Sequence, residues 1–316
     1  MTGSAAVHPR SGSGPEKPRR HLPAWLKRPR SMGEGFARTA SLLGDGRLQT
    51  VCSESRCPNQ HECWESGTAT FLVLGTVCTR HCGFCSVSHG RPAEPDPDEP
   101  SRLARAAEGM GLKHVVITSV TRDDLPDRGA GHFAACIGRL RARLPGVTVE
   151  VLTPDFGGSE KSIRAVIGAD PDVFAHNLET VERITPGIRS GASYRRSLAV
   201  LSAVRAMGAG ILTKSGLMLG LGESDSEVEE TLRDLKRTAV DMVTLGQYLR
   251  PAAGNMSVAR YVPPEEFDRW RDKAMEIGFR HVAAAPFVRS SYRAMESMKE
   301  SAGQACRLPA PASGRS

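Results

Sequence analysis

Three cysteines directly follow a short apolar run in the stretch Phe71-Leu-Val-Leu-Gly75-Thr-Val-Cys78-Thr-Arg-His-Cys82-Gly-Phe-Cys85. Residues 71–75 predict a buried strand, because a short apolar run that ends at a glycine is typical of parallel-sheet strands. The cysteines have the spacing C-x3-C-x2-C, close enough for three thiols to converge on one metal centre. A strand that runs directly into such a loop presents the metal centre at its C-terminal end.

Five further apolar runs follow, and polar residues stand at the end of each. They cover residues 114–120, 147–152, 173–175, 210–219 and 242–245, with amphipathic stretches such as 101–109 and 133–144 between them. Strands that alternate with helices are typical of βα units, whose C-terminal strand ends form the active face. Loops are polar in general, but the recurrence favours a shared site. We therefore expect an α/β fold, a partial (β/α)6 barrel of the TIM type.

Length and charge limit the class of protein. The 316 residues suffice for one large domain, and no apolar run approaches the roughly 20 residues of a membrane-spanning helix. Residues 1–31 contribute most of the formal net charge of +7, with seven basic residues and one acid. A basic arm beside a nearly neutral body is typical of a solvated segment that steers acidic partners. We therefore expect neither a nucleic-acid nor a membrane partner.

Eight cysteines are compatible with four disulfides or with metal ligation. A chain this long can form its own core, and its N-terminal residues lack the apolar segment of a secretory signal. We therefore expect reduced thiols and a cytoplasmic location. Residues 1–22 also have the Gly, Ser, Pro and Arg content of a transit peptide, but Glu16 and the lack of an amphipathic pattern disfavour one.

The thiols of Cys78, Cys82 and Cys85 have two chemical interpretations. Structural zinc needs four ligands, and His81 is a candidate for the fourth. A four-iron cluster bound by three thiolates instead leaves one iron open to an external ligand. Because no second cysteine pair follows at a distance, we favour the iron–sulfur cluster.

A second triplet precedes the first in Cys52-Ser-Glu-Ser-Arg-Cys57-Pro-Asn-Gln-His-Glu-Cys63, with the spacing C-x4-C-x5-C. Three buried core thiols are the alternative, but the Glu, Asn, Gln and His between them are poor core residues. A second cluster is therefore favoured, although this segment supplies no fourth thiol. Cys136 is most simply a core residue on a helix, and Cys306 lies in the C-terminal tail.

The C-x3-C-x2-C loop after the first strand resembles the motif of the radical S-adenosylmethionine (SAM) superfamily, and the triplet before it resembles the lipoyl synthase family. The resemblance covers about residues 22–295. Its matching stretches are Cys57-Pro-Asn, Gly67-Thr-Ala-Thr-Phe71, Val115-Val-Ile-Thr-Ser119, Arg122-Asp-Asp-Leu-Pro126, Leu152-Thr-Pro-Asp-Phe156, His176-Asn-Leu-Glu-Thr-Val181, Thr213-Lys-Ser-Gly216, Gly220-Leu-Gly-Glu223, Gly246-Gln-Tyr-Leu249 and Arg289-Ser-Ser-Tyr292.

The resemblance implies two [4Fe-4S] clusters with different tasks. The cluster on Cys78, Cys82 and Cys85 chelates SAM at its open iron, and an electron cleaves SAM to a 5′-deoxyadenosyl radical. Such a radical removes hydrogen from unactivated carbon, which no side-chain acid or base can do.

The resemblance also implies that Ser291 is the fourth ligand of the auxiliary cluster, beside Cys52, Cys57 and Cys63. Without the resemblance, two adjacent serines suggest only a cap or a turn. A hydroxyl oxygen is a harder donor to iron than sulfur, so we expect this bond to be the weak point of the cluster.

The reaction implied is the insertion of two sulfur atoms, at C6 and C8 of an octanoyl chain that is amide-linked to a lysine of a lipoyl carrier domain. The auxiliary cluster is the sulfur donor. Carriers of this kind are the H protein of glycine cleavage and the E2 subunits of 2-oxoacid dehydrogenases. A low-potential electron donor and an iron–sulfur cluster carrier complete the expected partners.

Five polar-tip residues are candidate SAM contacts by the same resemblance: Asn177, Glu179, Lys214, Gly216 and Gly220. The two glycines belong to a motif similar to the glycine-rich fifth-strand motif that lies along the adenine. Asn177 and Glu179 could instead cap the next helix. A barrel ion pair is the alternative for Lys214.

One segment departs from the family pattern. After Gly246-Gln-Tyr-Leu-Arg250-Pro, where a His-Leu-Pro-Val-like sequence is usual, this chain has Asn255-Met-Ser-Val258. Asn255 takes the place of the usual histidine, and a segment that lines the substrate mouth would alter carrier preference.

The expected organisation is a disordered basic tail at 1–22, an N-terminal extension at 23–70, the barrel at 71–285, the Arg-Ser-Ser-Tyr segment at 286–300 and a disordered tail at 301–316. The nearest alternative enzyme is a biotin synthase, which lacks the upstream triplet and the Arg-Ser-Ser-Tyr end. From other classes, an iron–sulfur electron carrier and a zinc-stabilised binding module remain alternatives.

Replacing Cys82 with alanine separates these possibilities. Cys82→Ala is expected to abolish SAM cleavage, because the radical-forming cluster loses one of its three thiolates. The measurement is 5′-deoxyadenosine after anaerobic incubation with SAM and a strong reductant. Retained 5′-deoxyadenosine formation would contradict the assignment.

Overall fold

The structure is a computed structural model that describes residues 22–27, 32–208 and 210–305. The expected basic tail at 1–22 therefore lies almost entirely outside the described residues, and so does Cys306. Among the described helices, none combines the length and the apolar character needed to cross a bilayer.

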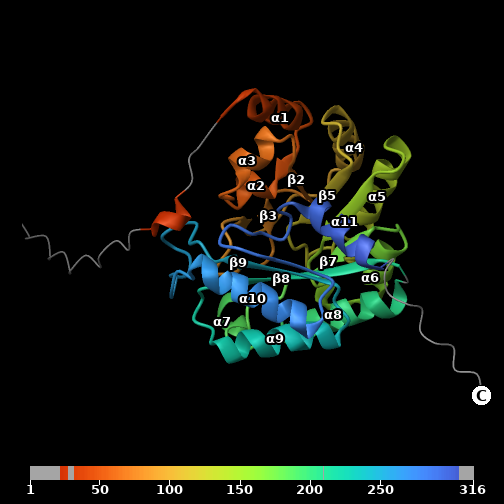
Figure 1. Ribbon diagram of the computed structural model, residues 1–316. Helices are drawn as coiled ribbons and strands as arrows, with labels where there is room; N and C mark the ends of the chain where they lie inside the picture. The colour runs from red at the N-terminus through yellow and green to blue at the C-terminus, as the bar shows by residue number, and fades with distance from the viewer. Residues whose placement is uncertain (1–21, 28–31, 209, 306–316) are drawn as a thin grey trace, which may run out of the picture.

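One eight-stranded sheet forms the centre of the molecule, in the order β1-β2-β5-β6-β7-β8-β9-β10 (Figure 1). Its strands are β1 (Gln49–Thr50), β2 (Thr70–Val73), β5 (His114–Ser119), β6 (Thr148–Leu152), β7 (Val173–Ala175), β8 (Leu212–Leu219), β9 (Met242–Gln247) and β10 (His281–Ala284). All pairs are parallel except β1 with β2. In the described chain no pairing joins β1 to β10, so the barrel stays open there, as expected.

The six expected strands are confirmed, and β1 and β10 extend the sheet beyond them. β1 has two residues and β10 has four, of which three are His281, Ala283 and Ala284. β1 contains only Gln49 and Thr50, and the apolar residues of β10 are mostly alanine, so hydrophobic patterning did not predict either strand. A two-stranded sheet of β3 (Val77–Cys78) and β4 (Ser88–His89) frames the cysteine loop.

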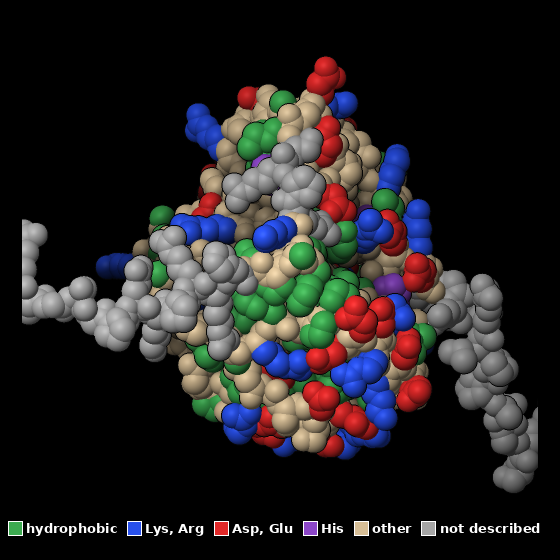
Figure 2. Space-filling view, turned by 60° about the vertical axis from the view of Figure 1, so that its left-hand side comes forward, with side chains coloured by type: hydrophobic (Ala, Val, Ile, Leu, Met, Phe, Trp, Pro, Cys, Tyr) green, Lys and Arg blue, Asp and Glu red, His purple; other side chains and the backbone are tan. Residues whose placement is uncertain are grey.

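Helices cover the outer face of the barrel (Figure 1). They are α4 (Glu99–Gly109), α5 (Ala130–Arg143), α6 (Glu160–Ile167), α8 (Tyr194–Met207), α9 (Asp225–Arg237) and α10 (Pro264–Ile277), with the short η2 (Phe156–Gly158) and α7 (Thr185–Ile188). Ile117, Phe133 and Val149 are fully buried in the core between strands and helices. On the face drawn in Figure 2, charged side chains of both signs are interspersed around a central group of hydrophobic ones.

The N-terminal extension forms η1 (Ala24–Leu26), α1 (Glu34–Asp45), α2 (Val51–Glu54) and α3 (Gln60–Glu65). Helix α1 packs against α3, and α2 packs against β1 and β2. The Glu65 carboxylate accepts hydrogen bonds from the backbone amides of Gly33 and Phe36, at 2.9 and 3.1 Å. Because these amides lie at the start of α1, where no helical carbonyl can accept from them, Glu65 fixes α1 onto α3.

Residues 286–293, here called the C-terminal strap, return across the C-terminal ends of β8 and β9. The backbone amide of Gln247 donates to Pro286 O at 3.1 Å. A Cβ on Gly246 would collide with Val288 O, and one on Gly216 would lie 2.9 Å from Ser290 Oγ. Both positions therefore need glycine. After the strap, α11 (Ala294–Ala305) packs against β10 and β5, so regular structure continues past residue 300, where we expected a disordered tail to begin.

Gly246→Ala is expected to displace the strap, because the added methyl group overlaps the Val288 carbonyl. The free energy of unfolding should fall by about 1–3 kcal/mol, as for other overpacked sites. Urea unfolding of the iron-free protein measures this change. Gly254→Ala is the matched control, since a Cβ there meets nothing within 4 Å; equal stability of the two variants would refute the role given to Gly246.

Candidate functional site

A cavity of about 1600 Å³ opens at the C-terminal ends of the strands and continues into the barrel. Its lining includes all six cysteines of the two triplets, together with Asn177, Glu179, Gly216 and Ser291. The structure therefore brings the two triplets and most of the expected SAM contacts to one space. Lys214 and Gly220 do not line it.

Backbone amides surround the thiols of the C-x3-C-x2-C loop. Cys78 Sγ accepts from the amides of Arg80 and Thr121, at 3.4 and 3.3 Å. Cys85 Sγ accepts from the amide of Val87 at 3.5 Å. These amides are therefore placed to donate to the sulfur atoms with which the loop would bind a metal centre.

The Arg80 side chain fixes this loop to the neighbouring strand tips. Its guanidinium binds Asp123 after β5 at 2.6 Å and Asp155 after β6 at 2.8 Å. The Asp155 side chain is fully buried and also accepts from Arg196 at 2.8 Å. Burial alone would raise the pKa of Asp155, but the hydrogen bond from Arg80 outweighs it and holds this pKa well below its usual range. Three strand ends are thus joined by a fully ionised network.

The zinc alternative has little geometric support. His81 stacks on His89, with 3.7 Å between the ring centroids, and is exposed. In the part of the chain that the structure describes, no three His, Cys, Asp or Glu side chains gather closely enough to hold one metal ion. A tetrahedral zinc needs its ligands around one point, whereas a four-iron cluster binds each thiolate at a different iron.

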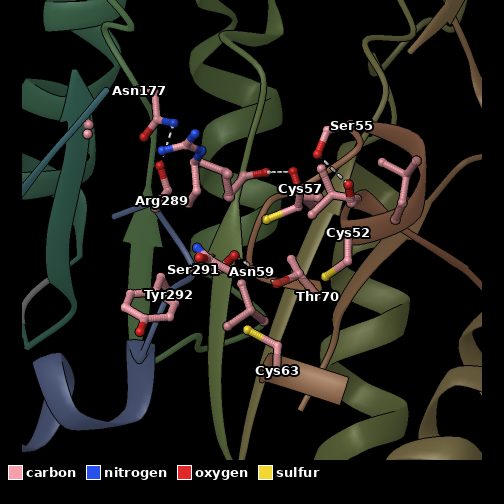
Figure 3. A pocket seen from close by; sticks show the side chains of 18 of the residues that line it. Cys52, Ser55, Cys57, Asn59, Cys63, Thr70, Asn177, Arg289, Ser291 and Tyr292 are labelled. Carbon is pink, nitrogen blue, oxygen red and sulfur yellow. Dashed lines mark hydrogen bonds between the residues drawn. The ribbon is translucent and has the colours of Figure 1, made fainter. Parts of the chain in front are cut away.

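The upstream triplet is presented by two short helices. Cys52 lies in α2, Cys63 lies in α3, and Cys57 lies in the turn between them, where its amide donates to Cys52 O at 3.0 Å. Thr50 caps α2 by accepting from Ser53 N at 3.2 Å. Figure 3 shows the three sulfur atoms pointing toward a common region, which Ser291 borders from the strap.

Three hydrogen bonds hold the strap against this triplet. Thr70 Oγ1, at the start of β2, donates to Ser291 Oγ at 2.8 Å. Asn59 donates to Phe287 O at 2.7 Å, and the Tyr292 hydroxyl donates to Glu62 at 2.7 Å. Asn59 and Glu62 both lie between Cys57 and Cys63 in the sequence. The structure therefore places Ser291 beside the upstream triplet, as the family resemblance implied.

The thiols of both triplets fit a cationic group. Burial, with Cys52 and Cys57 nearby, raises the pKa of Cys63 to about 12. Burial, with Cys85 nearby, raises the pKa of Cys82 to about 11. Bound iron would act in the opposite direction to burial, because a cation stabilises the thiolate form.

Asn177 and Glu179 meet at the tip of β7. Asn177 Nδ2 donates to Glu179 Oε1 at 3.1 Å and to Ser290 Oγ at 2.6 Å. Asn177 Oδ1 is buried and has no hydrogen-bond partner among the described residues. Burial raises the pKa of Glu179, and its backbone has a φ of 67°, a strained value for this residue type. Neither side chain caps a helix, since α7 begins after Ile184.

Residue patterns did not identify Ser290, Arg80 or Arg189 as part of this site. Arg189 is buried and donates to Asn177 O at 3.1 Å and to Ser197 Oγ at 3.1 Å. Its charge acts on Glu179 and Cys82. Burial of an arginine cannot be predicted from sequence alone, because the residue is usually exposed.

Lys214 and Gly220 have structural roles instead. Lys214 Nζ lies 2.9 Å from Glu150 Oε1 inside the barrel, and both side chains are 1% exposed, so the ion-pair alternative is correct. Gly220 has a φ of 97°, and a Cβ there would collide with Gln247 and Arg260. It belongs to a turn in which Glu223 accepts from the Gly220 amide at 2.6 Å.

Comparisons with known proteins agree with this geometry. The family described as "Radical SAM superfamily" matches residues 72–235. The chain is 50% identical to the lipoyl synthase of Rubrobacter xylanophilus, over 90% of this chain and 89% of that protein. It is 51% identical to the lipoyl synthase of Thermus thermophilus, over 89% of this chain and 87% of that protein.

Two solved structures share the fold at low sequence identity. Methylornithine synthase (PylB) has a TM-score of 0.52 at 15% identity, over 81% of this chain and 84% of that chain. Streptococcus suis SuiB bound to S-adenosylmethionine has a TM-score of 0.53 at 13% identity, over 67% of this chain and 49% of that chain. These similarities concern the fold alone.

Lys214→Met tests the ion-pair role. The free energy of unfolding should fall by about 3–5 kcal/mol, because Glu150 is left charged and buried. Burial raises the pKa of Glu150, but Lys214 outweighs it and the pKa lies below its usual value. The pair therefore stabilises the fold at neutral pH, and this contribution is lost as the pH falls through that lowered pKa.

Urea unfolding at pH 7 measures the loss, and the double variant Glu150→Leu with Lys214→Met should recover most of the stability. If Lys214→Met instead kept its stability and lost only SAM affinity, Lys214 would be a SAM ligand.

Proposed function

The chain belongs to the lipoyl synthase family of the radical SAM superfamily, and we propose how its own residues divide the reaction between the two cysteine triplets. Enzymes of this family insert two sulfur atoms, at C6 and C8 of an octanoyl chain carried by a protein lysine, and use SAM with a [4Fe-4S] cluster. One observation carries the proposal: both triplets and Ser291 line the same cavity.

Cys78, Cys82 and Cys85 hold the radical-forming cluster, which supplies an open iron for SAM and an electron to cleave it. The surrounding residues keep these three thiols in place. Arg80 joins their loop to two strand tips through Asp123 and Asp155. Because Arg80 is nearly buried and its partners are ionised, the loop is held in one position before SAM binds.

Asn177, Glu179 and Gly216 are the proposed SAM contacts. The unpaired Asn177 Oδ1 is buried and offers an acceptor for a donor group of SAM. The Glu179 carboxylate offers an acceptor for ribose hydroxyls or the methionine amino group. A ligand that donates to both would satisfy polar atoms whose burial is otherwise unfavourable.

Cys52, Cys57, Cys63 and Ser291 hold the auxiliary [4Fe-4S] cluster, which is a substrate because its sulfur is transferred to the octanoyl chain. Thr70 holds the Ser291 hydroxyl beside the triplet through a hydrogen bond of 2.8 Å. The N-terminal extension at 23–70 and the strap thus form the sulfur-donor site, while the barrel at 71–285 forms the radical site.

The carbon chain of the substrate must reach both triplets in turn, because hydrogen removal and sulfur attachment occur at the same carbon. A shared cavity allows this without release of the intermediate. The octanoyl-lysine substrates are lipoyl carrier domains of the H-protein and E2 types. The reaction also needs a low-potential electron donor and a cluster carrier that restores the auxiliary cluster.

Cys57→Ala tests this division of labour. Protein with reconstituted clusters is incubated anaerobically with an octanoyl-lysine peptide, SAM and a strong reductant, and peptide mass and 5′-deoxyadenosine are measured. The unaltered protein should give the doubly sulfurated peptide, and Cys57→Ala should give 5′-deoxyadenosine without a sulfurated peptide. Sulfurated product from Cys57→Ala would show that the auxiliary cluster is not the sulfur source.

A further inference from the structure

Residues 250–256, here called the bridging segment, lie against the backbone of the C-x3-C-x2-C loop. Asn255 Nδ2 donates to Cys85 O at 2.8 Å and contacts Gly83 O at 3.3 Å. The Met256 amide donates to the same Gly83 oxygen at 3.0 Å. One side-chain amide thus binds the carbonyls on both sides of Phe84, which fixes the peptide orientation of this part of the loop.

The same segment also reaches the upstream triplet. Arg56, which lies between Cys52 and Cys57, donates to Pro251 O at 3.2 Å. The two cysteine loops contact each other directly as well, through a hydrogen bond of 2.6 Å from Ser86 Oγ to Glu54 O. The two loops are therefore linked through the bridging segment and through one direct contact.

The bridging segment is in turn fixed to the barrel. The Tyr248 hydroxyl, at the end of β9, donates to Met256 O at 2.8 Å, and Tyr248 is 1% exposed. Asn255 itself is not among the residues that line the cavity. We therefore expect Asn255 to affect the reaction through the C-x3-C-x2-C loop that it holds. A direct contact between Asn255 and the substrate at the cavity mouth is not expected.

We propose that Asn255 is a positioning residue that sets the separation between the radical-forming and the sulfur-donating cysteine loops; this inference rests on the proposed function. Hydrogen abstraction and sulfur attachment each need reacting atoms in near contact, and misplacement by about 1 Å lowers such rates by about 100-fold. Loss of the Asn255 amide leaves both sets of ligands intact but lets the loops shift relative to each other. SAM cleavage then proceeds with fewer sulfur insertions per SAM molecule cleaved.

The first test uses the iron-free chain and does not depend on activity. In Asn255→Ala, amide hydrogen exchange of a peptide covering residues 83–86 should become faster, because the carbonyls of Gly83 and Cys85 lose a donor. Asn255→Leu, which is similar in size but has no donor, should behave alike. Ser257→Ala, at an exposed position of the same loop, is the matched control. Unchanged exchange in both Asn255 variants would overturn the proposal.

The second test uses protein with both clusters, an octanoyl-lysine peptide and SAM. For Asn255→Ala, the number of 5′-deoxyadenosine molecules formed per sulfur inserted should rise by about 10- to 100-fold, while iron content stays that of the unaltered protein. Asn255→His, the residue usual in the family, should restore the ratio because imidazole also has an N–H donor.

These outcomes distinguish a failure of the positioning role of Asn255 from a failure of the proposed function. An unchanged ratio in Asn255→Ala, or loss of iron from both triplets, would overturn the positioning role. If the unaltered protein forms no sulfurated peptide, the proposed function fails instead, and the hydrogen-exchange result still reports on the contacts of Asn255.

Discussion

The hydrogen bond from Thr70 to Ser291 joins residues 221 positions apart and, with those of Asn59 and Tyr292, fixes the strap beside the upstream triplet. It brings the C-terminal strap to β2, next to the short helices that carry the upstream cysteines. The approach is possible only because Gly216 and Gly246 leave room for the strap over the ends of β8 and β9. The proposed sulfur-donor site is thus assembled from the N-terminal extension and the C-terminal strap, which the barrel brings together.

Charged side chains also hold the site in place. The loop of the radical-forming triplet is bound by Arg80 to two carboxylates, and Arg189 lies buried between the tip of β7 and Cys82. These fixed cations face a cavity lined by thiols and by Glu179, whose carboxyl is itself raised in pKa by burial. Burial raises the pKa of Cys63 and of Cys82, and a bound cation at these thiols would lower both.

The sequence predicted the strands that carry the site because each was an apolar run followed by polar residues. It could not predict β1, because its two residues form a strand only through their pairing with β2. It could not predict β10 either, which is short and largely composed of small residues. Residue chemistry identified both cysteine triplets, but only the family resemblance singled out Ser291. A family motif alone can assign a residue to the wrong place, as Lys214 shows. The motif predicted that Lys214 contacts SAM, whereas in the structure it binds Glu150, 64 positions away, inside the barrel.

The ties between strap and extension are formed by protein groups alone, through Asn59, Tyr292 and Thr70. Asn59 and Tyr292 are not among the proposed cluster ligands, so consumption of the proposed sulfur donor would remove neither of their contacts.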